Sequence, residues 1–198
     1  MSAPQLVIGI DIGERNFGLA ALRFTPSATS RATTTIKWEW DVVLLRLWDL
    51  QAETTAHTSF ATARRLWALL DTIAWLWTCE QSSRPIVLVE QQMQSRHACN
   101  VRALKLAQHA VAYFLLRFPR DVDVLEMPAK HKTRAFGETF RLKRDRKAWT
   151  VAETIRRLTA QDDVVALHWL STLPKRDDVS DCIMMALAFW RMQNRSLT

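Results

Sequence analysis

Gln5-Leu-Val-Ile-Gly-Ile-Asp-Ile-Gly13 is the stretch of sequence that decides the fold. Its apolar run from Leu6 to Ile10 is short and β-branched, which predicts a buried strand, and Gly13 marks the turn into the next strand. The run ends in a single carboxylate, Asp11, and an ionised aspartate is rarely buried unless it is paired or holds a cation. Asp11 is therefore either a metal ligand or the cap of an Asx-type turn, and this strand alone leaves both interpretations open.

The same order of residues returns in Pro85-Ile-Val-Leu-Val-Glu90, where a second apolar run ends in a carboxylate. If the two strands are parallel neighbours, Asp11 and Glu90 meet at their carboxyl ends, where α/β sheets usually bind ligands. The alternative is that Glu90 caps the segment that follows it.

A third group of acids, Asp177-Asp-Val-Ser-Asp181, opens an apolar helix over 182–190. Asp178 and Asp181 are three residues apart, so they share one helix face. Acids at a helix start also offset the macrodipole, which accounts for Asp178 and for Asp177 as a helix cap. That alternative explains Asp181 less well, because an unpaired charge is costly at the head of a helix that is apolar nearly all round.

The hydrophobic periodicities predict an α/β fold: a mixed five-stranded sheet, with three antiparallel strands followed by two parallel ones, flanked by helices. The expected elements are strands at 5–11, 17–24 and 36–48, a helix from 59, a strand at 85–90, a helix from about 98, a strand at 122–127, and helices from about 146 and 181. Residues 164–170 fit a short extra strand. A chain of 198 residues with 48% hydrophobic content suits a single domain over 1–198.

Helical spacing assigns several large side chains to the core. They are Trp67, Trp75 and Trp77 in the first helix, Val101, Leu104, Val111, Leu115 and Phe118 in the second, and Val151, Ile155 and Leu158 in the third. The tryptophans could instead form a stacking platform, but aromatic residues on an amphipathic stripe usually belong to the core.

The net charge of +7 is concentrated in one segment. Its eight basic residues are Lys130, Lys132, Arg134, Arg141, Lys143, Arg144, Arg146 and Lys147, and only two acids, Glu138 and Asp145, lie among them. A run of charge is often a solvated face. The local excess of six in a chain that is otherwise near neutral favours phosphate binding instead.

The four carboxylates Asp11, Glu90, Asp178 and Asp181 are hard oxygen ligands with no His or Cys among them, which suits Mg²⁺ or Mn²⁺. If they converge, they can hold two cations roughly 4 Å apart, as in two-metal phosphodiester hydrolysis. The three cysteines are widely spaced with no C-x-x-C pair, so we expect no disulfide framework, no zinc site and a reducing, intracellular compartment. No apolar stretch approaches the roughly 20 residues of a membrane span, and the first strand starts too early for a signal or transit peptide.

Several motifs resemble those of RuvC-type Holliday junction resolvases, which are ribonuclease H-like nucleases. Gly9-Ile-Asp-Ile-Gly-Glu-Arg-Asn-Phe-Gly18 is similar to their first motif, Val89-Glu-Gln-Gln92 with residues 102–108 to the second motif and its helix, Glu126-Met-Pro-Ala-Lys-His-Lys132 to the segment with an essential lysine, and Asp178-Val-Ser-Asp181 to the closing acids. The matches span nearly the whole chain in the family's order. The Glu-Gln-Gln form, the Asp-Asp-x-x-Asp ending and the long third-strand loop resemble the poxvirus-type and fungal mitochondrial branch most.

The resemblance implies a function for each motif. The four acids Asp11, Glu90, Asp178 and Asp181 are the implied ligands of two Mg²⁺ ions. Lys132 is implied to contact the scissile phosphate, with Lys147 as a second basic contact. The family also implies a homodimer that binds branched DNA, with its interface largely on the helix after Glu90. If the protein is viral, it is expected in the host cytoplasm at sites of DNA replication.

Two features depart from the bacterial pattern: Met93 replaces an aromatic residue that wedges into the junction, and the stretch 161–176 is longer.

Taken with the resemblance, the four acids and the basic segment predict a metal-dependent endonuclease that resolves four-way DNA junctions by paired symmetric nicks. One alternative is a ribonuclease H or a monomeric nuclease acting on RNA or an RNA–DNA hybrid. Others are an actin-like ATPase or sugar kinase, disfavoured because the chain has only four glycines, and a non-catalytic DNA-binding module.

Overall fold

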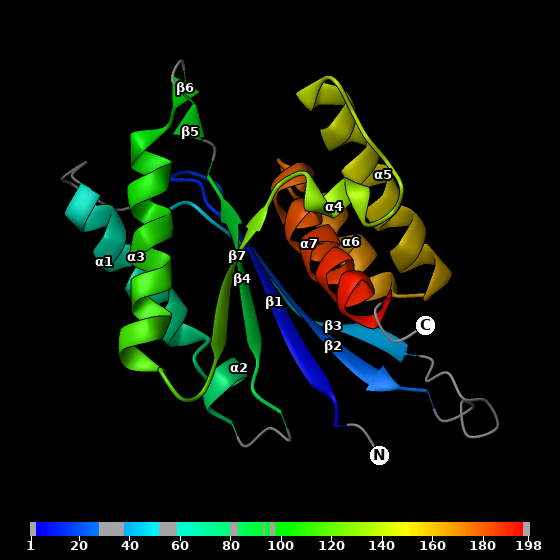
Figure 1. Cartoon of the computed structure of the whole chain (residues 1–198), viewed down its shortest axis with the longest axis horizontal. Helices are drawn as coiled ribbons and strands as arrows, with labels where there is room; N and C mark the ends of the chain where they lie inside the picture. The colour runs from blue at the N-terminus through cyan, green and yellow to red at the C-terminus, as the bar shows by residue number, and fades with distance from the viewer. Residues whose placement is uncertain are drawn as a thin grey trace.

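The computed structural model describes residues 3–27, 38–51, 59–79, 83–92, 94–95 and 98–195. At its centre is a five-stranded sheet in the order β3-β2-β1-β4-β7 (Figure 1). Strands β1 (Gln5–Asp11), β2 (Phe17–Pro26) and β3 (Trp38–Trp48) form an antiparallel meander, and β4 (Ile86–Gln91) and β7 (Asp123–Pro128) extend it parallel to β1. The predicted sheet of three antiparallel strands followed by two parallel ones is confirmed.

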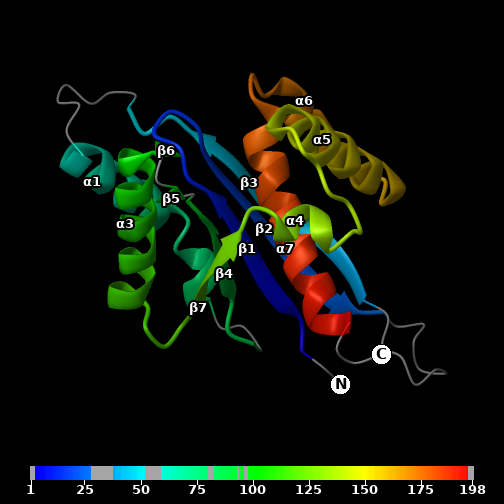
Figure 2. The same ribbon diagram turned by 45° about the horizontal axis from the view of Figure 1, so that its top comes forward.

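Helices cover both faces of the sheet, as Figures 1 and 2 show from two directions. One face carries α1 (Ser59–Thr72), α2 (Trp75–Thr78) and α3 (Val101–Arg117); the other carries α4 (His131–Arg134), α5 (Lys143–Ala160), α6 (Val164–Thr172) and α7 (Arg176–Arg195). A short hairpin of β5 (Gln94–Ser95) and β6 (Ala98–Cys99) precedes α3. No helix among the described residues is long and apolar enough to cross a membrane.

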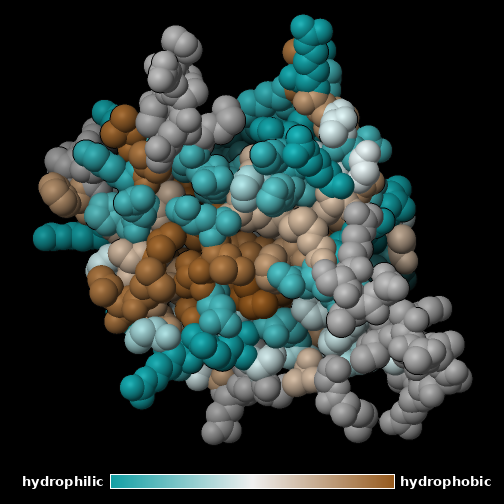
Figure 3. All heavy atoms as spheres, viewed as in Figure 1, coloured by the Kyte–Doolittle hydropathy of each residue, from teal (hydrophilic) through white to brown (hydrophobic). Residues whose placement is uncertain are grey.

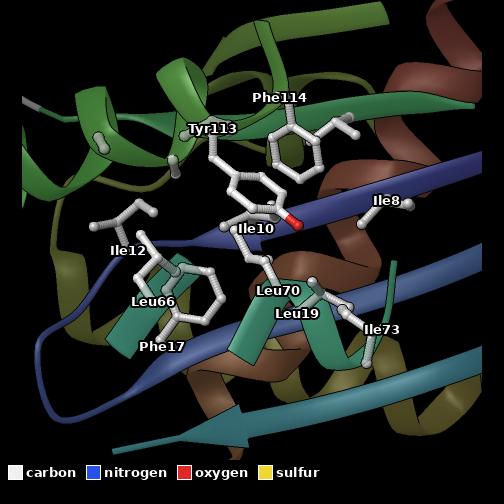
Figure 4. Packing of buried hydrophobic residues seen from close by; sticks show 14 of the residues in the cluster. Ile8, Ile10, Ile12, Phe17, Leu19, Leu66, Leu70, Ile73, Tyr113 and Phe114 are labelled. Atoms are coloured by element: carbon white, nitrogen blue, oxygen red, sulfur yellow. The ribbon is translucent and has the colours of Figure 1, made fainter. Parts of the chain in front are cut away.

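Successive side chains of β1 point to opposite faces of the sheet, and each face carries its own hydrophobic core. Ile8 and Ile10 pack with α1 and α3 (Figure 4), whereas Val7 belongs to the cluster around α7. The hydroxyl of Tyr113 in the first core donates a 2.7 Å hydrogen bond to Oδ1 of Asp71, so this buried oxygen is paired. The two cores fix α3 and α7 on opposite faces.

Two glycines let α7 lie close against the sheet. A Cβ atom at Gly9 would clash with the carbonyl oxygen of Cys182, and one at Gly18 would lie 3.0 Å from the carbonyl oxygen of Asp178. Because β1 and β2 carry no side chain at these positions, the start of α7 packs directly on the backbone near the end of β1. The aspartates of α7 are thereby brought to the carboxyl end of β1.

The expected strand at 164–170 is wrong, since this segment is helix α6. The Asp163 side chain accepts a 2.9 Å hydrogen bond from the Ala166 N–H, which caps the helix start. Ala166 and Leu170 are buried against neighbouring helices, while Val164 and Val165 are exposed. A short apolar run fits a strand or a helix equally well, and here the cap and the packing decide it.

The expected inward faces of two helices are correct for Val111, Phe118 and Leu158, which pack in the core, and wrong for other residues. In α3 the buried residues are Ala103, Leu106, Ala107, Ala110, Tyr113 and Phe114, so Val101 and Leu115 are exposed. In α5 they are Thr150, Thr154 and Leu158, and Ile155 is exposed. Trp77 is buried as expected, but Trp75, the first residue of the separate short helix α2, is exposed. Small residues let helices pack closely. A prediction that relies on large aliphatic side chains therefore overlooks the faces that small residues form.

Candidate functional site

Three carboxylates meet at the carboxyl ends of β1 and β4. Asp11 ends β1, Glu90 lies near the end of β4, and Asp181 projects from the second turn of α7. Oxygen atoms of all three lie within 4.8 Å of one another. The parallel register pairs Ile10 with Val89, which sets Asp11 beside Glu90 as the sequence predicted.

Lys132 lies inside this carboxylate cluster. Its Nζ atom is 3.2 Å from Oε1 of Glu90 and 3.0 Å from Oδ2 of Asp181, and only 1% of its side chain is exposed. The short helix α4, directly after β7, delivers it. Burial alone would lower the pKa of Lys132, but the carboxylates of Glu90, Asp181 and Asp11 raise it, so the lysine remains charged.

The acids carry more negative charge than this lysine can balance. Burial raises the pKa of Asp11 well above its usual range, and the neighbouring charge of Glu90 adds to the effect. Burial also raises the pKa of Asp181, against the opposing effect of Lys132. For Glu90 burial is outweighed by Lys132 and by the hydrogen bond from Asp11, so its pKa is lowered. Three oxygen ligands with one counter-charge fit a hard divalent cation.

Asp178, the fourth predicted ligand, is buried one helical turn earlier on α7. Its oxygens lie 2.8 and 3.1 Å from Nζ of Lys175, and Oδ1 lies 3.7 Å from Nζ of Lys147. Lys147 also forms an ion pair with Asp177, which is an acid in the first turn of α7. Asp178 lines the same cavity as the other three acids, and its role as a metal ligand stays a prediction.

A cavity of about 680 Å³ opens above these acids. Its lining comes from the β1–β2 turn, the end of β4, the start of α3, the first turns of α5 and the start of α7. Figure 1 shows the starts of α3 and α5 on opposite sides of the ends of β4 and β7. The basic residues in the lining are Arg15, Lys143, Arg146, Lys147 and Lys175. An acidic floor beneath basic walls is suited to a phosphate group held beside metal ions.

Of the eight basic residues in the predicted phosphate-binding segment, four lie at the site and four lie outside it. Lys143, Arg146 and Lys147 line the cavity, and Lys132 lies in the carboxylate cluster. The remaining predicted contacts, Lys130, Arg134, Arg141 and Arg144, are exposed outside the lining. Met93 lies outside the described residues.

Sequence reasoning missed Lys175. It precedes Asp178 by three residues and pairs with it, and that i, i+3 spacing on a helix start was the available signal. Lys175 belongs to the stretch 161–176, whose predicted role was open. The structure thus gives one end of that stretch a place in the cavity wall.

Comparisons with known proteins concern the fold. No protein-family model and no curated relative matches the sequence. The structure of Thermus thermophilus RuvC matches with a TM-score of 0.60 at 15% identity, covering 96% of this chain and 96% of that chain. A structure of T. thermophilus RuvC in complex with Holliday junction substrate matches with a TM-score of 0.58 at the same identity and coverage.

These matches define the class of fold. The chain has the ribonuclease H-like fold of RuvC, with the same mixed sheet and flanking helices, over nearly its full length. At 15% identity the likeness concerns the fold, so the activity must be argued from the site.

Proposed function

We propose that this protein is a metal-dependent endonuclease that cuts four-way DNA junctions by paired symmetric nicks. The observation that carries the proposal is the convergence of Asp11, Glu90 and Asp181 within 4.8 Å on the floor of a basic cavity. The RuvC-like fold supports it, because one neighbour of this fold was solved with a Holliday junction substrate.

Each part of the site has a role in this proposal. Asp11, Glu90 and Asp181 would hold Mg²⁺ or Mn²⁺ ions, two per site, with Asp178 as a further ligand. When bound, such ions activate water and steady the leaving oxygen of an in-line phosphodiester displacement. Lys132 offsets the charge of the carboxylates and, in the role that the sequence resemblance implies, contacts the scissile phosphate. The basic residues of the cavity wall bind the DNA backbone.

Cleavage of a synthetic four-way junction, with nick positions mapped on a sequencing gel, tests the proposal. The wild type with Mg²⁺ is expected to nick two opposed strands at symmetric positions. Asp11→Asn is expected to bind the junction but not to cut it, because it removes a ligand without adding bulk. Full activity in Asp11→Asn would overturn the proposed site.

The choice of nucleic acid is tested by competition. Wild-type protein is offered a labelled junction against unlabelled junction, linear duplex or RNA–DNA hybrid of equal length. The proposal expects only the unlabelled junction to compete strongly. Preferential cleavage of the hybrid would instead support the ribonuclease H alternative.

We further propose that the protein acts as a homodimer, because two opposed nicks need two sites related by a dyad. Apolar surface gathers over β7 and the adjoining face of α3 (Figure 3). The side chains of Leu116 on α3 and Leu125 on β7 are 74% and 44% exposed. β7 is also an edge strand of the sheet. Exposed apolar residues beside a free strand edge favour association.

Sedimentation equilibrium tests the dimer. Wild type is expected at twice the monomer mass, and the double variant Leu116→Glu/Leu125→Glu as a monomer. Val165→Glu is the matched control, because Val165 is 81% exposed on α6, on the other face of the sheet. A wild-type monomer that still makes paired nicks would contradict this part of the proposal.

The proposed branch of the resolvases to which the chain is nearest rests on the sequence motifs alone. We propose that the chain is nearest to the poxvirus-type and fungal mitochondrial resolvases, on the strength of Glu90-Gln-Gln92 and Asp177-Asp-x-x-Asp181. Such a protein would work in a reducing compartment inside the cell.

A further inference from the structure

Arg146 is a cation of the cavity wall that lacks an anion partner. It is partly buried, and its Nε atom is shut off from solvent with no hydrogen-bond partner among the described residues. No carboxylate of the described chain lies within salt-bridge distance of it. The other cations near the acids, Lys132, Lys147 and Lys175, are each paired with a carboxylate. A half-buried guanidinium without a partner costs free energy, which indicates a ligand that supplies the missing acceptor.

The position of Arg146 points to the reacting group. It lines the same cavity as Asp11, Glu90 and Asp181. Arg146 and the three acids therefore face the same cavity, so a group bound in that cavity can contact both.

The start of α5 adds independent support. Leu142 occupies the N-cap and offers no side-chain cap, and Lys143, Arg144 and Arg146 outnumber the single acid of the first turn, Asp145, where acids are favoured. This arrangement weakens the helix start unless an anion binds there. Lys143 also lines the cavity and has no carboxylate partner among the described residues, one helical turn before Arg146.

We propose that Arg146 binds a non-bridging oxygen of the phosphate at which the strand is cut, and that Lys143 binds a neighbouring phosphate of the same strand. The inference rests on the proposed function only in taking a phosphodiester as the substrate. Lys132 is already paired with Glu90 and Asp181, so Arg146 adds a donor to the phosphate beside Lys132 and does not replace it.

The two cations then contribute to different steps. A guanidinium can donate two parallel hydrogen bonds to a phosphate and stabilise the charge that builds on it during displacement. Loss of such a donor costs about 10²- to 10³-fold in kcat. Lys143 contacts a phosphate that does not react, so its loss weakens binding and leaves the rate at saturation nearly unchanged.

Single-turnover cleavage at saturating protein, together with DNA binding measured in Ca²⁺, tests this division. Arg146→Ala is expected to lower the cleavage rate about 10²- to 10³-fold while affinity changes little, and added guanidinium chloride is expected to restore part of the rate. Lys143→Ala is expected to lose affinity and keep its rate. Arg156→Ala, at the exposed far end of α5 and paired with Glu153 alone among the residues that the structure describes, is the matched control.

Each contrary result has a distinct meaning. An Arg146→Ala rate within about threefold of wild type overturns the inference. If Arg146→Ala unfolds, Arg146→Gln replaces it: it keeps a polar side chain but removes the charge, and a rate equal to wild type overturns the inference equally. If the wild type cuts a hybrid but no junction, the proposed function fails while Arg146 is tested on the hybrid. If the wild type cuts no nucleic acid at all, both fail.

Discussion

The Nζ atom of Lys132 lies 3.0 Å from Oδ2 of Asp181, and only 1% of the lysine side chain is exposed. This buried ion pair joins α4, which follows the edge strand β7, to α7 on the same face of the sheet. Because Glu90 also contacts Lys132, three segments that are distant in sequence depend on one charge. The lysine is therefore part of the fold as well as of the site.

Lys132→Met is expected to destabilise the protein by about 3–5 kcal/mol, because it leaves buried carboxylates without their counter-charge. Urea unfolding in the presence of EDTA measures the loss. Mg²⁺ should recover part of it by supplying another cation to the same acids. Lys130→Met is the control, since Lys130 is exposed two residues away and its loss is expected to change stability by less than about 0.5 kcal/mol. Equal stability of the two variants would contradict the structural role of Lys132.

Gly9→Ala is expected to cost about 1–3 kcal/mol and to weaken metal binding, because the added methyl clashes with the carbonyl oxygen of Cys182 and pushes α7 away from β1. That movement separates Asp181 from Asp11. Thermal unfolding with and without Mg²⁺ reports both effects. Gly137→Ala is a useful contrast: Gly137 has a φ of +84° but nothing within 4 Å of a Cβ, so it should lose about 1 kcal/mol and keep its metal response.

The convergence of Asp11 and Glu90 could be predicted because strand ends in a parallel pair share one sheet edge, and a short apolar run closed by an acid marks each end. The contacts of Asp178 could be predicted only in part, from the i, i+3 spacing of Lys175. They depend on Lys175 and Lys147 reaching the start of α7 from its preceding loop and from α5. The secondary structure of residues 164–170 could not be predicted either, because their apolar pattern fits both a strand and a helix. Packing against α5 and α7 decides for the helix.

Glu153 should make stability pH-dependent. Hydrogen bonds from Arg156, and the charge and hydrogen bond of Arg157, hold the pKa of Glu153 below its usual range against the opposing effect of burial. A lowered carboxyl pKa contributes stability that is complete above the unfolded value of about 4.3 and is lost as the pH falls through the folded value. Glu153→Gln should therefore cost about 1 kcal/mol at pH 7, and this difference should vanish in acid.

Denaturant unfolding between pH 2.5 and 7 follows the difference between Glu153→Gln and wild type. Glu138→Gln is the control, since Glu138 is exposed and no described cation pairs with it. A difference that stays constant over this range would show that Glu153 acts through packing and not through its charge.

Asp11→Asn is expected to separate stability from metal binding. Burial and the neighbouring charge of Glu90 raise the pKa of Asp11, so ionising it costs stability as the pH rises through its folded value. An uncharged amide of the same shape avoids that cost, so in EDTA at pH 7 the variant should be at least as stable as wild type. Mg²⁺ at a hundred times its dissociation constant should stabilise wild type by about 2.7 kcal/mol and the variant far less. Thermal unfolding in EDTA and in Mg²⁺ gives both comparisons, and an equal Mg²⁺ response in the two proteins would exclude Asp11 as a ligand.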